Sequence, residues 1–206
     1  MNWAYAVEFV EVSVDPSAGP GEIPYKACET GNAVLSVWPL GNVRAARHIE
    51  TDDWYHPPSA DGSPSGTRLG GRVWITADTL VGDRPLHLYS MHLASVYDGQ
   101  EIRRAEAIEV GDDALAQPFP ERAILGGDMN VGVYSLDLML GNDLDIIVKA
   151  LTDRGFVDAH LGMPFDERVS SPPLVLDLLM ALGAAWSEPG VGEGAVFDPF
   201  ADHRPV

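Results

Sequence analysis

An acid and an amide two residues apart follow an apolar segment in the middle of the chain. Residues 123–125 predict a buried strand that two glycines end, and Asp128 and Asn130 come directly after. Residues i and i+2 of an extended backbone point to the same side, so both side chains can face one pocket. A carboxylate beside a neutral amide suits hydrolysis, because one orients water and the other holds a substrate oxygen without adding charge. The alternative is a plain turn, since Gly, Asp and Asn favour turns.

Further acidic residues and histidines stand at strand ends or in apolar surroundings. His92 follows a predicted strand, and Asp177 is the one acid among the apolar residues 174–182, a run typical of either a helix or a buried strand. Burying that carboxylate is costly unless it is paired, so the alternative is an amphipathic helix with Asp177 on its wet edge. Asp202 and His203 are adjacent near residue 206, where such a pair is ordinarily solvated.

The chain is strongly acidic. Its 206 residues carry 31 acidic side chains against 13 Lys and Arg, which gives a net charge of −18. This charge repels polyanions and argues against tight, non-specific binding to long nucleic acid unless cations screen it. It favours a cation-binding site or a high-salt environment. The length and the 46% hydrophobic content predict one packed domain, residues 1–206.

Signals for targeting and for covalent cross-links are few. Cys28 is the single cysteine, so no intramolecular disulfide is possible. The first residues lack a basic stretch followed by an apolar run, and no apolar run reaches the roughly 20 residues of a membrane helix. We therefore expect a soluble protein without a signal peptide or membrane span, cytoplasmic by default. No protein partner is implied.

Apolar periodicity predicts a mixed α/β chain. Strands are expected at residues 3–14, 31–40, 43–49, 72–80, 86–91, 123–125 and 156–158, and helices at 100–116 and 143–151. In the first strand we expect Glu8 and Glu11 to be solvated edge charges. The Pro- and Gly-rich residues 15–31 and 52–71 predict loops, of which the second is long enough to rim a site.

Several segments, in this order, resemble motifs of the endonuclease/exonuclease/phosphatase superfamily. They are Gly-Asn-Ala-Val-Leu-Ser-Val-Trp-Pro-Leu at 31–40, Met-His-Leu at 91–93, Gly-Asp-Met-Asn at 127–130, Gly-Phe-Val-Asp-Ala at 155–159, Leu-Asp-Leu-Leu at 176–179 and Ala-Asp-His-Arg-Pro-Val at 201–206. The resemblance covers nearly the whole chain, and the ordered set is more specific than any single motif. It implies an α/β fold of four layers, a two-sheet β-sandwich flanked by helices, with the site among loops at one end.

The resemblance also implies a role for each candidate residue near the end of the chain. His203 would act as the general base or contact the phosphate, and Asp177 would hold its ring in the correct orientation. Asp202 would help to bind a divalent cation. Oxygen ligands at a carboxylate-rich site favour Mg²⁺ or Mn²⁺ over zinc.

The other three candidate residues would act on the water and on the phosphoryl group. By the same resemblance, Asp128 would orient or deprotonate the attacking water, and Asn130 would hold a phosphate oxygen. His92 would donate a proton or a hydrogen bond to the phosphoryl group or the leaving oxygen. The implied activity is metal-dependent hydrolysis of a phosphoester in a small molecule, a lipid headgroup or a nucleic acid.

One part of the family pattern has no counterpart here. The family opens with a strand carrying an Asn and, after a helix, a strand ending in Gln-Glu, whose Glu is the principal metal ligand. Glu8, Glu11 and Glu29 are not obvious substitutes, so we expect a fold that is incomplete at both ends. The chain is then either a truncated form of an enzyme or a degenerate, non-catalytic member that binds metal weakly or serves as an interaction module. A third hypothesis is an acidic, halophilic binding protein without a site.

Overall fold

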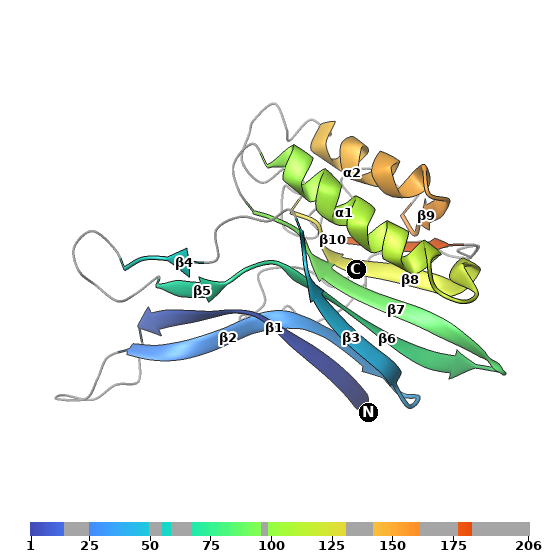
Figure 1. Ribbon diagram of the computed structural model, residues 1–206, viewed down its shortest axis with the longest axis horizontal. Coiled ribbons are helices and arrows are strands. Elements are labelled where there is room, and N and C mark those ends of the chain that lie inside the picture. The colour runs from blue at the N-terminus through green and yellow to red at the C-terminus, as the bar shows by residue number, and fades with distance from the viewer. Residues whose placement is uncertain are drawn as a thin grey trace.

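Two β-sheets packed face to face, with two helices on the outside of one of them, form the fold (Figure 1). The computed structural model describes residues 1–14, 25–49, 55–58, 67–95, 99–130, 142–160 and 177–182. The helices are α1 (Gln100–Leu115) and α2 (Asn142–Thr152), and both cover the same face of the larger sheet. Neither described helix is long and apolar enough to cross a membrane. The predicted two-sheet sandwich flanked by helices is confirmed.

The larger sheet contains six strands and the smaller sheet four. The larger has, in spatial order, β3 (Gly41–Arg47), β6 (Val73–Val81), β7 (Arg84–His92), β8 (Ala123–Asp128), β10 (Asp177–Leu182) and β9 (Phe156–Asp158). The smaller has β2 (Tyr25–Ser36), β1 (Asn2–Val14), β5 (Arg68–Gly70) and β4 (Tyr55–His56). A short 3-10 helix, η1 (Pro120–Arg122), precedes β8. Among the described strands, β7 and β8 alone pair in parallel, with α1 as the crossover between them.

Most predicted elements are confirmed, with three differences. β2 begins at Tyr25, inside the predicted loop 15–31, because it pairs with β1 along its whole length. β4 and β5 lie within the predicted loop 52–71, where β5 pairs with β1. The ambiguous run 174–182 is a strand from Asp177 onward, and residues 174–176 lie outside the described part. After Asp177, β10 is apolar because it lies between β8 and β9.

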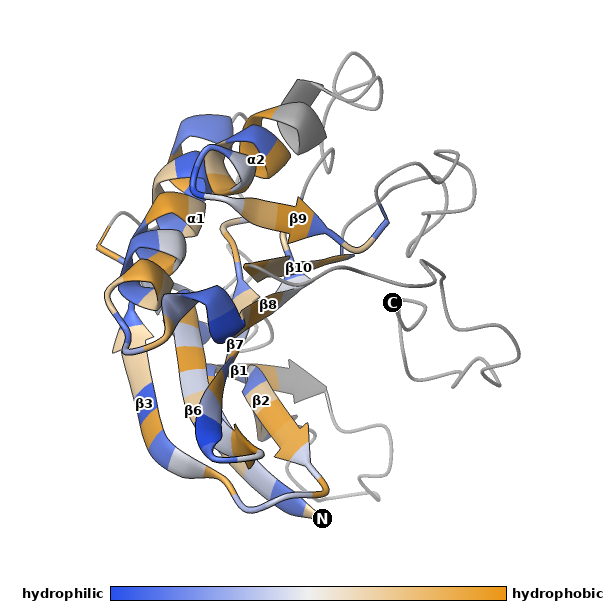
Figure 2. Cartoon of the chain, turned by 90° about the vertical axis from the view of Figure 1, so that its right-hand side faces the viewer, coloured by the Kyte–Doolittle hydropathy of each residue, from blue (hydrophilic) through white to orange (hydrophobic). Residues whose placement is uncertain are grey.

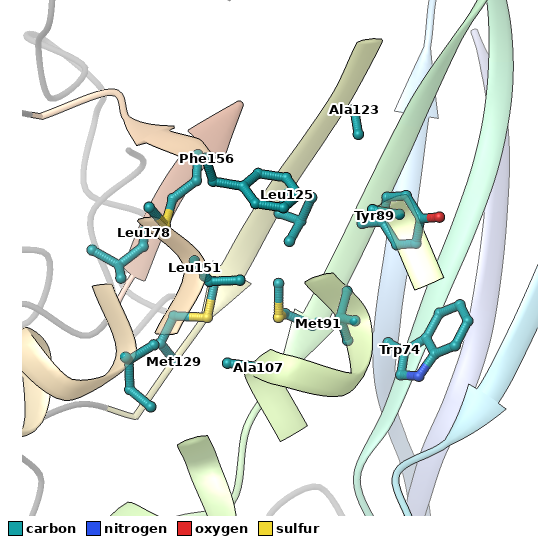
Figure 3. Packing of buried hydrophobic residues seen from close by; sticks show 14 of the residues in the cluster. Trp74, Tyr89, Met91, Ala107, Ala123, Leu125, Met129, Leu151, Phe156 and Leu178 are labelled. Carbon is teal, nitrogen blue, oxygen red and sulfur yellow. The ribbon is translucent and has the colours of Figure 1, made fainter. Parts of the chain in front are cut away.

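Two apolar clusters hold the layers together. The larger lies between the helices and the larger sheet, where side chains such as Met91, Leu125 and Leu151 converge (Figure 3). The smaller lies between the sheets, where small residues of β1 and β2 meet Val73, Ile75 and Ala77 of β6. Figure 2, turned by 90°, shows the helices on the far side of the larger sheet from β1 and β2. Burial of each large apolar side chain contributes about 1.5–3 kcal/mol, so both clusters stabilise the packing of the layers against one another.

Candidate active site

Three of the candidate residues lie side by side at one end of the larger sheet. The ladder pairs His92 of β7 with Asp128 of β8, and Asp128 with Asp177 of β10. Parallel pairing puts the ends of β7 and β8 at one edge, and antiparallel pairing brings the start of β10 to the same edge. His92 Nε2 lies 3.5 Å from Asp128 Oδ2, and both side chains are about one-fifth exposed, at 22% and 21%. His92 and Asp128 are therefore open to a ligand, whereas Oδ2 of Asp177 is buried.

A buried ion pair lies behind His92. Glu8 Oε1 accepts a hydrogen bond from Arg72 Nη1 at 2.7 Å, and Glu8 Oε2 accepts one from His92 Nδ1 at 2.9 Å. Arg72 Nη2 also donates to Ser95 Oγ at 2.7 Å. Glu8 is 2% exposed and Arg72 is 4% exposed. The prediction that Glu8 is a solvated edge charge is therefore wrong, whereas Glu11 is partly exposed.

A β-bulge in β1 lies at Glu8, whose side chain faces the interior of the protein. The register between β1 and β2 shifts between Val7 and Phe9, so Glu8 is the extra residue. Bulges often re-aim a side chain beside a functional site. β5 lies close beside this point at Gly70, whose φ is +126°, and a Cβ there would collide with the Glu8 carbonyl oxygen. Gly71 N then donates to that oxygen at 3.0 Å. The two glycines thus allow Arg72 to follow directly beside Glu8.

The partners of His92 determine which ring nitrogen carries hydrogen. An ionised carboxylate only accepts, so Nδ1 donates to Glu8. Arg72 Nη1 lies almost equally far from both ring nitrogens, 2.8 Å from Nδ1 and 2.9 Å from Nε2, so the guanidinium lies against the ring and is not aimed at the lone pair of one nitrogen. A hydrogen on Nε2 faces Asp128 Oδ2, 3.5 Å away. The ring is held between the Glu8 and Asp128 carboxylates, with Nε2 directed to the exposed end of the sheet.

The charge state of Glu8 follows from two opposing effects. Burial alone would raise its pKa, but the hydrogen bonds and positive charges of His92 and Arg72 outweigh burial and lower the pKa below the ordinary value of 4.5. Glu8 is therefore ionised at neutral pH and remains an acceptor for His92. Sequence reasoning missed Glu8, Arg72 and Ser95. The one available signal was that Glu8 continues the every-second-residue spacing of the buried Ala4 and Ala6.

Asn130 closes a turn beside the row of residues. Its backbone N–H donates to Asp128 Oδ1 at 2.8 Å, and its φ of +50° is left-handed. Its Nδ2 donates to Leu93 O at 2.8 Å, and the residue is 5% exposed. Asp128 and Asn130 thus form a turn, as one of the two interpretations predicts, and Asp128 also adjoins His92. The phosphate-binding role of Asn130 remains a prediction.

The remaining candidate residues, Asp202 and His203, lie outside the described residues, and so does any contact between Asp177 and His203. Within the described ranges no group of three or more acidic, His or Cys side chains is placed to hold a metal ion. Asp128 and Asp177 are the carboxylates that the described site offers at its exposed edge. The described residues alone therefore do not make up a metal site.

Comparison with known proteins defines the fold. No protein-family model and no curated protein matches the sequence. The structure is similar to the endonuclease/exonuclease/phosphatase of Beutenbergia cavernae DSM 12333, with a TM-score of 0.54 and 17% identity over 88% of this chain and 46% of that one. The structure is also similar to a D. rerio TDP2 humanized by 14 mutations, with a TM-score of 0.50 and 17% identity over 88% of this chain and 64% of that one. A third similar structure is a truncated TDP2 of Caenorhabditis elegans, with a TM-score of 0.50 and 15% identity over 89% of this chain and 64% of that one.

The chain thus spans about half to two thirds of the length of these structures. At such identities the likeness establishes the fold alone. The protein has an endonuclease/exonuclease/phosphatase-like fold, as the resemblance of its motifs predicts.

We expect Arg72→Met to lower the free energy of unfolding by about 3–5 kcal/mol, because Glu8 is left as a buried charge without its cation. Urea denaturation at neutral pH measures this loss. The exposed Arg104, which lies 3.6 Å from Glu101, gives the control Arg104→Met, expected to change stability by less than about 0.5 kcal/mol. The Glu8→Gln/Arg72→Met double variant recovers part of the loss, because no buried charge remains. Equal stability of Arg72→Met and Arg104→Met would contradict the ion pair.

Acid should weaken the wild-type protein through Glu8. Because the pKa of Glu8 is lower in the folded than in the unfolded chain, its stabilising contribution is fully present above about pH 5 and is lost as the pH falls through the folded value. Urea midpoints measured from neutral pH into this acid range should therefore fall less steeply in Glu8→Gln than in the wild type. Parallel slopes would show that Glu8 does not titrate differently on folding.

Proposed function

We propose that this protein is a metal-dependent hydrolase of phosphoester bonds, either phosphodiesters or phosphomonoesters. The observation that carries the proposal is the row formed by His92, Asp128 and Asp177 across three neighbouring strand ends. Behind it lies the buried pair of Glu8 and Arg72, which fixes the His92 ring. The fold supports the proposal, since a similar solved structure bears the name endonuclease/exonuclease/phosphatase.

His92 and Asp128 would act on the protons of the reaction. An anionic phosphoester repels hydroxide, so hydrogen-bond donors must neutralise the charge that builds up in the transition state. Asp128, whose Oδ1 accepts from Asn130 N and so fixes the carboxylate, would orient or deprotonate the attacking water. His92, tied through Nδ1, would present Nε2 to the phosphoryl group or the leaving oxygen and donate a hydrogen bond or a proton there.

The other assigned roles extend this site. Asn130 would hold a phosphate oxygen, Asp177 would hold His203, and His203 would act as general base or phosphate contact. Arg72, neutralised by Glu8 at 2.7 Å, supports the His92 ring from behind. These roles place proton transfer and charge neutralisation on different residues of one sheet end.

Mg²⁺ or Mn²⁺ is the metal that the donor chemistry favours, because the residues at this edge offer carboxylate oxygens. The described residues do not complete a site, so the proposal assigns the ion to Asp202 together with the carboxylates of the exposed edge. When bound, such a cation neutralises charge on the phosphoryl oxygens.

The net charge of −18 favours a small phosphate ester or a lipid headgroup over long nucleic acid. Steering by the whole-protein field would oppose the approach of a polyanion, although bound cations and added salt reduce this effect. Nucleic acid stays within the proposed substrate class.

A non-catalytic role is the second candidate. The part of the chain that the structure describes holds no set of three metal ligands, and Glu8 is fully engaged with Arg72 and His92. Both observations are also what a degenerate member would show, one that binds metal weakly or acts as an interaction module.

Hydrolysis of bis(p-nitrophenyl) phosphate and p-nitrophenyl phosphate with Mg²⁺ or Mn²⁺ tests the proposal. We expect metal-dependent turnover that a chelator abolishes and that Asp128→Asn and His92→Gln each lower by a factor on the order of 10²–10³. Asp153→Asn, which changes an exposed acid of the Lys149–Asp153 pair, should retain full activity.

Folded protein without turnover would instead support the non-catalytic role. Turnover that persists in Asp128→Asn would place the reaction elsewhere on the protein.

A further inference from the structure

We propose that Glu106 and Arg103 of α1 are positioning residues for His92, and that they act by clamping the backbone of Ala94. The proposal rests on the proposed function, since it concerns the residue that would present a ring nitrogen to the phosphoryl group. It assigns to α1 a task beyond packing against the sheet.

Both hydrogen-bonding groups of the Ala94 backbone are taken by α1. Ala94 N donates to Glu106 Oε2 at 2.7 Å, and Ala94 O accepts from Arg103 Nη1 at 3.0 Å. The two side chains are three residues apart, so they lie on one face of the helix. Glu106 and Ala94 are 0% exposed and Arg103 is 2% exposed. The clamp is therefore removed from water.

Arg103 and Glu106 are the two charged residues among the buried residues of α1. The other buried residues of α1 are small or apolar and include Ala107, Val110 and Ala114, which belong to the main core cluster. An apolar residue at 103 or 106 would extend that cluster, whereas a buried acid and a buried base must each be compensated. Each of the two charges makes a hydrogen bond to the segment that follows His92, and we attribute a positioning role to these two bonds.

The clamp completes a set of bonds that surrounds the segment after His92. Leu93 N donates to Asp128 O at 2.9 Å, and Leu93 O accepts from Asn130. Ser95 Oγ accepts from Arg72. Ala94, between them, is held from the opposite side by α1. Misplacement of a reacting group by about 1 Å can cost on the order of 10²-fold in rate, so loss of the clamp should be felt at His92.

The test compares Glu106→Leu, which removes the acceptor for Ala94 N, with Glu106→Gln, which keeps an oxygen at that place. We expect Glu106→Leu to lower kcat for bis(p-nitrophenyl) phosphate by about tenfold or more with KM nearly unchanged, and Glu106→Gln to restore most of kcat. Asp113→Asn is the matched control. Asp113 lies on α1 like Glu106, but its carboxylate accepts hydrogen bonds from Arg44 and Tyr89 and does not contact Ala94. It should lower stability and leave kcat unchanged.

A second measurement is independent of hydrolysis. The NMR signal of the hydrogen on His92 Nδ1 should shift or broaden in Glu106→Leu and stay in place in Glu106→Gln and Asp113→Asn. If the wild type hydrolyses neither substrate, the proposed function fails, and this signal alone decides the positioning role. An unchanged signal in Glu106→Leu, or wild-type kcat in an active protein, would overturn the inference.

A further variant covers the case in which Glu106→Leu does not fold. Arg103→Met/Glu106→Gln removes both buried charges of the clamp. It keeps an acceptor for Ala94 N and leaves Ala94 O without its donor on Arg103. It should give a smaller loss of kcat and a smaller change of the His92 signal than Glu106→Leu is expected to give. Wild-type values of both quantities in this double variant would contradict the clamp.

Discussion

A carboxylate and a guanidinium, both almost fully removed from water, meet behind one histidine, and the arrangement of the site depends on this contact. Glu8 comes from β1 of the smaller sheet, Arg72 immediately precedes β6 of the larger sheet, and His92 ends β7. The contact therefore joins the two sheets at the end where the candidate residues gather. A buried ion pair of this kind is seldom more stabilising than apolar residues of similar volume. Its orientation of His92 is the more direct reason for its presence.

Backbone geometry brings the participants together. Glu8 faces inward at a bulge of β1, and Gly70 lets β5 lie close beside this residue where the chain leads to Arg72. On the other side, Gly127 has a φ of +140°, and a Cβ there would collide with the Met91 carbonyl oxygen. Gly127 thus lets β8 approach β7 closely where the ladder reaches His92 and Asp128. Close approach of the backbone at these two glycines thus helps to place the candidate residues.

Sequence patterns predicted the part of the site that is carried by local signals. Asp128 follows a buried strand and His92 ends another, so their place at strand ends could be read directly. The sequence around Asp177 suits either a helix or a strand, because a short apolar run is typical of both. The pairing of β10 with β8 and β9 shows that this segment is a strand. The resemblance of ordered motifs correctly gave the two-sheet sandwich.

The missed residues depend on distant contacts. Glu8 was expected in solvent, because a charged residue in an aromatic and β-branched strand ordinarily marks an edge. Its partners, Arg72 and His92, lie 64 and 84 residues away in the chain, and a bulge leaves no clear trace in composition. Strands β4 and β5 were missed for a similar reason, since short pieces of sheet in a polar segment form only where a partner strand is already in place.

The protonation of the His92 ring tests the central claim most directly. Nitrogen-15 NMR of the ring at neutral pH distinguishes hydrogen on Nδ1 from hydrogen on Nε2. The account predicts that Nδ1 carries hydrogen in the wild type, and that Glu8→Leu releases the ring into an exchanging mixture of tautomers. A wild-type ring without hydrogen on Nδ1, or a ring that behaves identically in both proteins, would contradict the account.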